Sequence, residues 1–363
     1  MRISKWMKCI AFIAVVAGVN MLMSFLYEPA NGASSRMWAG YYSEEKIDTI
    51  FVGSSLCQQT FIPSIFDEKM GVKSYNMGTP SQAVPQTMRA IEVAVEEHDI
   101  KTIVYAMGFS SLKHGPIKEA EMTFESARTR EKGGIEGMFE MLGYMYSEDV
   151  IAEEKSINFL FPWTFNNEGY TREDVEKNVA PKLKKLKEYI KTGKIDKTDG
   201  LQKGFRNDDK SVFNYDNRWT VNTDRFYNPD FNMGMLAEFE LLLKFCYEKG
   251  IELIVINTPH PIFDVVTCYE YYEENERQIK EYCQRYNADY YDFSLAKSEI
   301  YEIKGTHFCD YEHLNKQGAK DFCEKLSDFL LRREEEDMDA YFYSVDEFLE
   351  IHAEELKEWK ESK

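Results

Sequence analysis

Two short segments, far apart in the chain, carry the residue types of a serine nucleophile and its base. Gly53 is followed by the hydroxyls of Ser54 and Ser55, and Asp310 and His313 stand three residues apart. A serine becomes a nucleophile when a base takes its proton and a third group orients that base. A loop can fold the Asp-x-x-His spacing so that the carboxylate holds one imidazole nitrogen while the other faces a serine. The residues predict acyl transfer with Ser55 as nucleophile, His313 as base and Asp310 as the orienting acid.

Two neighbouring residues compete for these roles. Ser54 is the alternative nucleophile, and His307 is the alternative base. Each segment also has an ordinary structural explanation, because serine and aspartate occupy loops and cap helices in many proteins. The local spacing does not decide among these alternatives, so the elements that position the two segments must be considered.

Apolar and β-branched runs predict five strands that alternate with helical segments. Such alternation is typical of a mostly parallel sheet with helices on both faces, and its strands open their carboxyl ends on one edge, where α/β proteins bind ligands. The expected strands cover 47–52, 72–76, 102–106, 251–256 and 289–293.

The same sheet edge would supply groups that bind a substrate. The oxyanion formed in acyl transfer needs N–H donors. The amides of Ser55 and Gly78 suit this task, since glycine allows a close approach of the backbone. The second strand also delivers Asn76, and the fourth delivers His260. We expect Asn76 to bind substrate; for His260 the alternative is a solvated loop histidine.

Three blocks of this sequence resemble those of a known family. Gly-Ser-Ser-Leu at 53–56 resembles the GDSL block of SGNH hydrolases, Tyr-Asn-Met-Gly at 75–78 their glycine block, and Asp-Tyr-Glu-His-Leu-Asn at 310–315 their DxxH block. The resemblance covers roughly residues 47–332, with the insertion at 113–232 outside it. It implies a flavodoxin-like, three-layer α/β/α fold with a parallel five-stranded sheet, and esterase or acyltransferase activity. It also implies the same roles for Ser55, His313 and Asp310, with Gly78 in the oxyanion hole.

The chain departs from that family at two places. Ser54 replaces the aspartate of the first block, and Ser110 stands where the family has the asparagine that completes the oxyanion hole. The Gly-Ser-Ser form is similar to membrane-anchored members such as the teichoic acid D-alanylation and alginate O-acetylation proteins. This likeness implies a cell-envelope glycan or lipid as acyl acceptor and a membrane-bound acyl donor protein as partner, with Ser110 as a shorter oxyanion donor.

A long apolar run precedes these blocks. The nineteen residues from Cys9 to Tyr27 carry no charge, and Arg2, Lys5 and Lys8 stand before them. Such a run can cross a hydrocarbon core of about 30 Å, and the basic residues favour a cytoplasmic amino terminus. We expect a single-pass cell-membrane protein whose main domain is extracytoplasmic. A cleaved signal peptide is the alternative, and it would export the same domain.

The rest of the chain is expected to form one α/β domain with additions. The inserted region is rich in charge and aromatic residues; its aromatic rings and lysines would suit a glycopolymer groove, with a packed aromatic core as the alternative. The expected parts are an anchor at 1–27, a polar linker at 28–46, the catalytic domain at 47–332 with a helical insertion at 113–232, and an acidic helical tail at 333–363.

Composition excludes several other functions. The net charge of -19 disfavours a nucleic acid partner. No CxxC pair, metal cluster, phosphate loop or dinucleotide motif is present, so we expect neither a metal nor a cofactor. Exported cysteines permit disulfides, and one could join Cys57 and Cys309 on adjacent loops, with free, partly buried thiols as the alternative. Two other functions stay open: a hydrolase of small esters that uses the same residues, and a non-catalytic envelope scaffold with a degenerate site.

Overall fold

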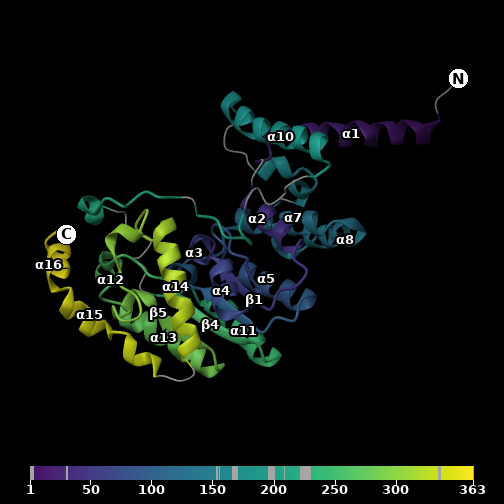
Figure 1. Cartoon of the computed structure of the whole chain (residues 1–363). Helices are drawn as coiled ribbons and strands as arrows, with labels where there is room; N and C mark the ends of the chain where they lie inside the picture. Colours follow the sequence, from purple (N-terminus) through teal and green to yellow (C-terminus); the bar gives the residue numbers. More distant parts are fainter. Residues whose placement is uncertain are drawn as a thin grey trace. The chain divides into compact units, whose positions relative to one another are not determined.

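The computed structural model describes residues 4–29, 32–152, 154, 156–165, 171–194, 201–207, 209–220, 230–333 and 337–362. The chain forms two compact units, and each is assembled from separate stretches of sequence (Figure 1). The first unit joins Met1–Tyr42 to Met122–Gly200, and the second joins Ser43–Glu121 to Leu201–Lys363.

A five-stranded parallel sheet forms the centre of the second unit. All five expected strands are present, which confirms the α/β class. Thr49 pairs with Ser74 on one side and with Thr102 on the other, so the first strand lies inside the sheet. The strands, in the spatial order β2-β1-β3-β4-β5, are β1 (Thr49–Gly53), β2 (Ser74–Asn76), β3 (Thr102–Ala106), β4 (Glu252–Asn257) and β5 (Asp289–Asp292).

Helices cover both faces of this sheet, giving three layers. On one face Phe51 packs against Phe61 and Phe66, and on the other Tyr105 contacts Phe239. Burial on both faces explains why the strands are apolar along their length. One face carries α4 (Pro63–Met70) and α14 (Lys316–Arg332), and the other carries α5 (Val84–Glu97), α11 (Met233–Lys249) and α13 (Tyr272–Arg285). Shorter helices are α3 (Ser55–Thr60), α6 (Ser110–Lys113) and α12 (Ile262–Thr267).

The carboxyl-terminal segment is part of this unit's core. Residues 333–363 were expected to form an appended acidic tail, but α15 (Val345–Ile351) and α16 (Ala353–Ser362) pack on the domain. Phe348 is buried beside Val265 and Tyr272. The acidic residues of this segment mask a few apolar positions that face inward, and these positions decide where it packs.

The first unit is helical. α1 (Lys5–Tyr27) is long and apolar enough to cross a membrane, with a mean hydropathy of 2.3 over its most apolar window. Besides α1 the unit contains α2 (Ala33–Tyr41), most of α7 (Lys118–Lys132), α8 (Gly134–Met145), α9 (Glu148–Ala152) and α10 (Arg172–Thr192).

Two expected boundaries differ from this arrangement. The segment 28–46, expected as a polar linker, contains α2, whose Trp38 and Tyr41 are fully buried. Trp38 packs edge-on against Phe124 of α7, so apolar residues at helical spacing outweigh the polar composition around them. The expected insertion at 113–232 is divided, because only its stretch Met122–Gly200 belongs to the first unit.

Candidate active site

The turn after β1 presents Ser55 at the carboxyl edge of the sheet. Gly53 has φ +135°, and a β-carbon there would lie 2.5 Å from the Ala106 carbonyl oxygen. Glycine therefore permits the sharp turn into α3. Ser54 is the N-cap of that helix, and its hydroxyl accepts the Leu56 N–H at 3.3 Å. The Ser54 hydroxyl is therefore used to cap α3, while Ser55 is the first residue of that helix.

Ser55, His313 and Asp310 form one chain of hydrogen bonds. His313 Nε2 lies 2.8 Å from Ser55 Oγ, and His313 Nδ1 lies 2.9 Å from Asp310 Oδ2. Both distances are within direct hydrogen-bond reach. The structure thus brings together the three residues that the sequence analysis assigned to catalysis, in the order nucleophile, base and orienting acid.

A tight loop sets the spacing between Asp310 and His313. The second carboxylate oxygen of Asp310 accepts the backbone N–H groups of Glu312 at 2.9 Å and of His313 at 2.7 Å. Phe308 and Leu314 pair as an isolated antiparallel bridge that closes the loop. One aspartate therefore both folds the loop and orients the imidazole, which explains the separation of three residues.

The electrostatics of this loop keep Asp310 ionised. Burial opposes the charge, but the hydrogen bond from His313 and the two backbone donors outweigh it and lower the pKa of Asp310 below its ordinary value. An ionised Asp310 favours a proton on His313 Nδ1, which leaves Nε2 as the acceptor for the Ser55 proton. Glu312 places a second carboxylate oxygen 3.8 Å from the same Nδ1.

A pocket of about 410 Å³ opens beside Ser55. It lies next to the point where the strand order reverses between β1 and β3, the usual ligand site of such sheets. Its lining residues include neither lysine nor arginine, and they mix hydroxyls with apolar groups. They are Ser54, Ser55, Leu56, Ser81, Gln82, Ala83, Ser110, Ser111, His114, Gly115, Ile117 and Glu312.

Several residues that line the pocket were not predicted from the sequence. Gln82, His114 and Ile117 come from loops without a recognisable pattern. Glu312 could have been predicted to lie at the site, because it stands between Asp310 and His313 in the sequence. Ser110 was expected at the site and does line the pocket.

Asn76 and Gly78 were expected to contact the substrate, but both make hydrogen bonds inside the protein instead. Asn76 is fully buried; its amide nitrogen donates to the carbonyls of Cys57 and Phe61, both at 2.8 Å. Its side-chain oxygen accepts the Gly78 N–H at 2.9 Å, so the expected oxyanion donor is already engaged. A β-carbon at Gly78 would lie 2.6 Å from the Gln58 nitrogen. Both residues serve the packing beneath α3.

The other two histidines singled out in the sequence are buried away from the pocket lining. His260 Nδ1 lies 2.7 Å from the Thr258 carbonyl, and burial lowers the pKa of His260. His307 lies 3.0 Å from the Tyr301 hydroxyl through Nδ1 and 3.4 Å from Asp321 through Nε2. His260, expected to contact substrate, and His307, the alternative base, thus both make hydrogen bonds or ion pairs within the fold.

All seven cysteines are free thiols. Cys57 donates to Asn76, and the Cys309 thiol faces the His313 carbonyl at 3.5 Å, so the possible disulfide between them is not formed and both are free thiols. Among the described residues no group of three or more histidine, cysteine or acidic side chains is arranged to hold a metal ion.

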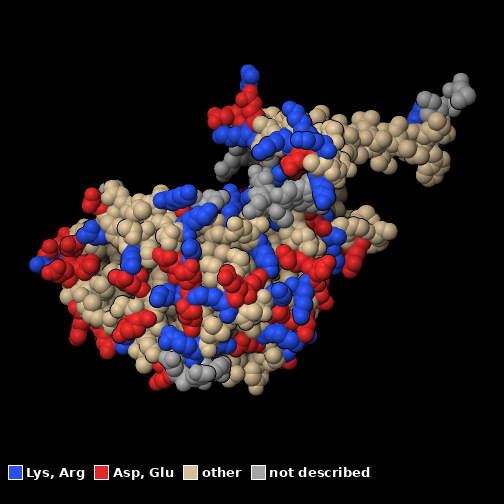
Figure 2. All heavy atoms as spheres, in the orientation of Figure 1, with Lys and Arg blue, Asp and Glu red and all other residues tan. Residues whose placement is uncertain are grey.

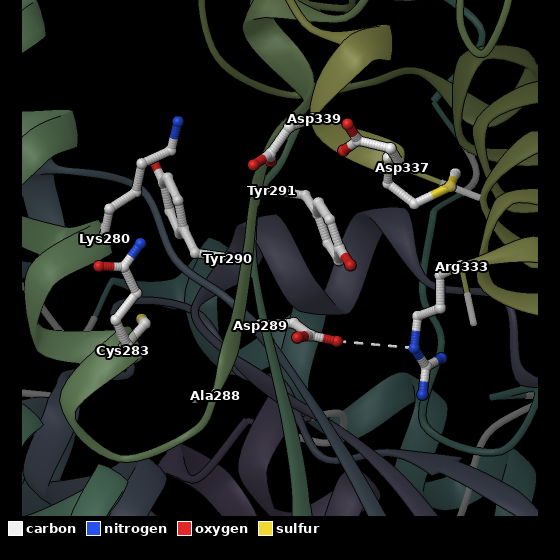
Figure 3. Close-up of a pocket in the computed structure, with 11 residues that line it drawn as sticks. Lys280, Cys283, Ala288, Asp289, Tyr290, Tyr291, Arg333, Asp337 and Asp339 are labelled. Atoms are coloured by element: carbon white, nitrogen blue, oxygen red, sulfur yellow. Dashed lines mark ion pairs between the residues drawn. The ribbon is translucent and has the colours of Figure 1, made fainter. Parts of the chain in front are cut away.

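A second pocket, of about 310 Å³, lies at the amino end of β5, the opposite edge from Ser55 (Figure 3). Arg333 Nε faces Asp289 there at 3.6 Å, and Arg333 also pairs with Glu252 of β4. Arg333 ties the end of α14 to two strands, and this pocket offers no serine beside a base.

No protein-family model matches the chain, and no curated protein matches it. It is similar to the crystal structure of a protein assigned as an acylhydrolase from Bacteroides fragilis, with 10% identity and a TM-score of 0.36, over 81% of this chain and 92% of that one. It is also similar to a protein assigned as a platelet activating factor from Streptococcus pneumoniae, with 10% identity and a TM-score of 0.36, over 87% and 99%. At such similarity, function must be argued from the site.

Proposed function

We propose that this chain is a serine-dependent esterase or O-acyltransferase that works outside the cell membrane on a cell-envelope glycan or lipid. The observation that carries the proposal is the hydrogen-bonded chain from Ser55 Oγ through His313 to Asp310. Its position at the carboxyl edge of the sheet, beside an open pocket, supports the same reading.

The reaction would proceed in two acyl transfers. His313 Nε2 takes the Ser55 proton as Oγ attacks the acyl carbonyl, and the ionised Asp310 stabilises the imidazolium. The leaving alcohol then takes that proton, and Ser55 carries the acyl group. In the second step His313 deprotonates the acceptor, either a glycan or lipid hydroxyl or water, which attacks the acyl carbonyl. The bond between the acyl carbon and Ser55 Oγ then breaks, and His313 returns the proton to Oγ. The Ser55 amide and the Ser110 hydroxyl are the proposed oxyanion donors.

The pocket lining favours a small neutral acyl group. Leu56, Ala83 and Ile117 supply apolar surface, and several hydroxyls supply hydrogen bonds. A negatively charged acyl group would meet Glu312 there, with no lysine or arginine in the lining to pair with. The acceptor and a membrane-bound acyl donor protein as partner are part of the proposal.

A non-catalytic envelope scaffold is the second candidate. It is favoured by the engaged Gly78 amide and by serine in place of asparagine at position 110, since both weaken the oxyanion hole. A fluorophosphonate probe separates the two: the active enzyme should label at Ser55, and Ser55→Ala should not label. Absence of labelling in the intact wild-type chain would favour the scaffold. Release of a short acyl group to water or to an added glycan oligomer would then distinguish hydrolysis from transfer.

A further inference from the structure

Helix α10 has two halves of different character. A capping box at Thr171 and Asp174 begins it, and its first turns alternate acidic and basic residues. The second half is basic: residues 182–192 contain five lysines and one glutamate, in a chain whose net charge is -19. Figure 2 shows lysine and arginine side chains gathered over α10 beside the uncharged shaft of α1. A basic segment in so acidic a chain suits an anionic partner.

An apolar stripe runs along the same basic half. Leu183, Leu186 and Ile190 follow one another at helical spacing and are 42%, 48% and 75% exposed, and Tyr189 beside them is 46% exposed. A surface helix normally turns such a stripe toward a protein core. Lysines that flank an exposed leucine and isoleucine stripe are typical of helices that lie in a membrane interface. A glycan would favour aromatic faces over this aliphatic one.

α10 is fixed to the last turns of α1. Lys182 Nζ donates to the carbonyls of Ser24 at 2.9 Å and Phe25 at 2.8 Å, and thereby caps the end of the apolar helix. Asn178 Nδ2 donates to the Tyr27 carbonyl at 3.2 Å. The basic half of α10 therefore begins where the apolar run of α1 ends.

A second segment reaches further along α1. Trp163 Nε1 donates to Asn20 Oδ1 at 2.9 Å, and Asn20 Nδ2 donates to the Leu160 carbonyl at 2.8 Å. Asn20 lies seven residues before Tyr27, a rise of roughly 10 Å. The segment also explains how the polar Asn20 is accommodated in the apolar run.

We infer that the basic half of α10 lies in the interface of an anionic lipid leaflet, at the point where α1 leaves the membrane. The aliphatic stripe would enter the acyl boundary, and Lys184, Lys187 and Lys191 would contact lipid phosphates. The inference requires α1 to be retained as a transmembrane helix. It assigns α10 a lipid contact that is separate from catalysis.

Hydrogen exchange of the full-length chain in nanodiscs tests this inference. Amides of residues 183–194 should exchange at least about tenfold more slowly in nanodiscs with phosphatidylglycerol than in phosphatidylcholine alone. The triple variant Lys184→Gln, Lys187→Gln, Lys191→Gln should lose that difference. The control variant Arg172→Gln, Lys177→Gln, which removes two positive charges from the mixed-charge half of α10, should keep it. Amides of α11 serve as the internal reference.

Two results would overturn the inference. Equal exchange of residues 183–194 in the two lipid compositions would remove the anionic membrane contact. Protection that appears only when soluble poly(glycerol phosphate) is added would instead assign the lysines to an anionic glycopolymer.

Discussion

At the residue scale, Ser54 and Ser55 are adjacent hydroxyls with different tasks. Ser54 accepts the Leu56 N–H, and Ser55 faces His313. Ser55→Ala should lower kcat/KM for a short acyl ester by about 10³-fold or more, since it removes the nucleophile. Ser54→Ala should keep activity and lose about 0.5–2 kcal/mol of stability with the cap. Steady-state hydrolysis of a p-nitrophenyl ester and urea denaturation measure the two effects. The opposite pattern would make Ser54 the nucleophile.

Two carboxylates lie near His313, and they are predicted to differ in effect. Asp310 contacts Nδ1 at 2.9 Å, whereas Glu312 is 3.8 Å away. Asp310→Asn should lower kcat by about 10²- to 10⁴-fold, because the amide favours the wrong imidazole tautomer. Glu312→Gln should cost much less. An equal loss in the two variants, measured by steady-state kinetics, would contradict the assignment of Asp310 as the orienting acid.

His260 should make stability depend on pH. Burial lowers the pKa of His260 below its ordinary 6.5, so the unfolded chain binds this proton more readily. The contribution of the buried, neutral His260 to the free energy of unfolding is complete above about pH 6.5. It is lost as the pH falls below 6.5, because the unfolded chain then takes up the proton first. His260→Gln, which retains a donor for the Thr258 carbonyl, should reduce the loss in unfolding free energy between about pH 7.5 and pH 5.5. Urea titrations of both proteins at the two pH values measure this, and an unchanged pH slope would refute it.

The sequence predicted the position of a side chain correctly where the strand order and a short spacing allow only one arrangement. Ser55, Asp310 and His313 could be placed together because strand ends and a short spacing constrain them. Asn76 and Gly78 belong to the same recognisable blocks, but their hydrogen bonds depend on how α3 packs on β2. A linear pattern does not reveal which of two neighbouring polar groups faces inward.

At the scale of elements, α15 attaches through few side chains. Phe348 is 2% exposed, whereas Ile351 on the same helix is 57% exposed. Phe348→Ala should lower the free energy of unfolding by about 3–5 kcal/mol through lost burial and a cavity. Ile351→Ala should change it by less than about 0.5 kcal/mol. Urea midpoints would report both. A small effect of Phe348→Ala would indicate that the segment is the peripheral tail expected from its sequence.

Strands were easier to predict than helix packing. β3 (Thr102–Ala106) matches its expected limits, and the other strands shift by a residue or two, because buried parallel strands are continuous apolar runs. α2 and α15 were missed or misjudged because both are short and surrounded by polar residues. Their burial depends on partners distant in sequence, such as Phe124 for Trp38 and Val265 for Phe348.

At the scale of the whole molecule, membrane topology is the main testable expectation. Arg2, Lys5 and Lys8 precede the apolar run of α1, which favours retention of the amino terminus in the cytoplasm. Protease added to intact spheroplasts should remove the part that follows Tyr27, while a cytoplasmic marker stays intact. Protection of that part would reverse the topology, and its release into the medium without protease would indicate cleavage of α1.

The first unit is built from two stretches that are far apart in time as well as in sequence. Met1–Tyr42 leaves the ribosome long before Met122–Gly200, which completes the unit. At ordinary rates of synthesis α7 is complete roughly 5–20 s after Tyr41. During this interval Trp38 and Tyr41, fully buried in the finished unit, have no partner from α7. A nascent chain would have to hold these side chains in a temporary environment, which a chaperone would provide, or the bilayer surface if α1 is inserted in a membrane.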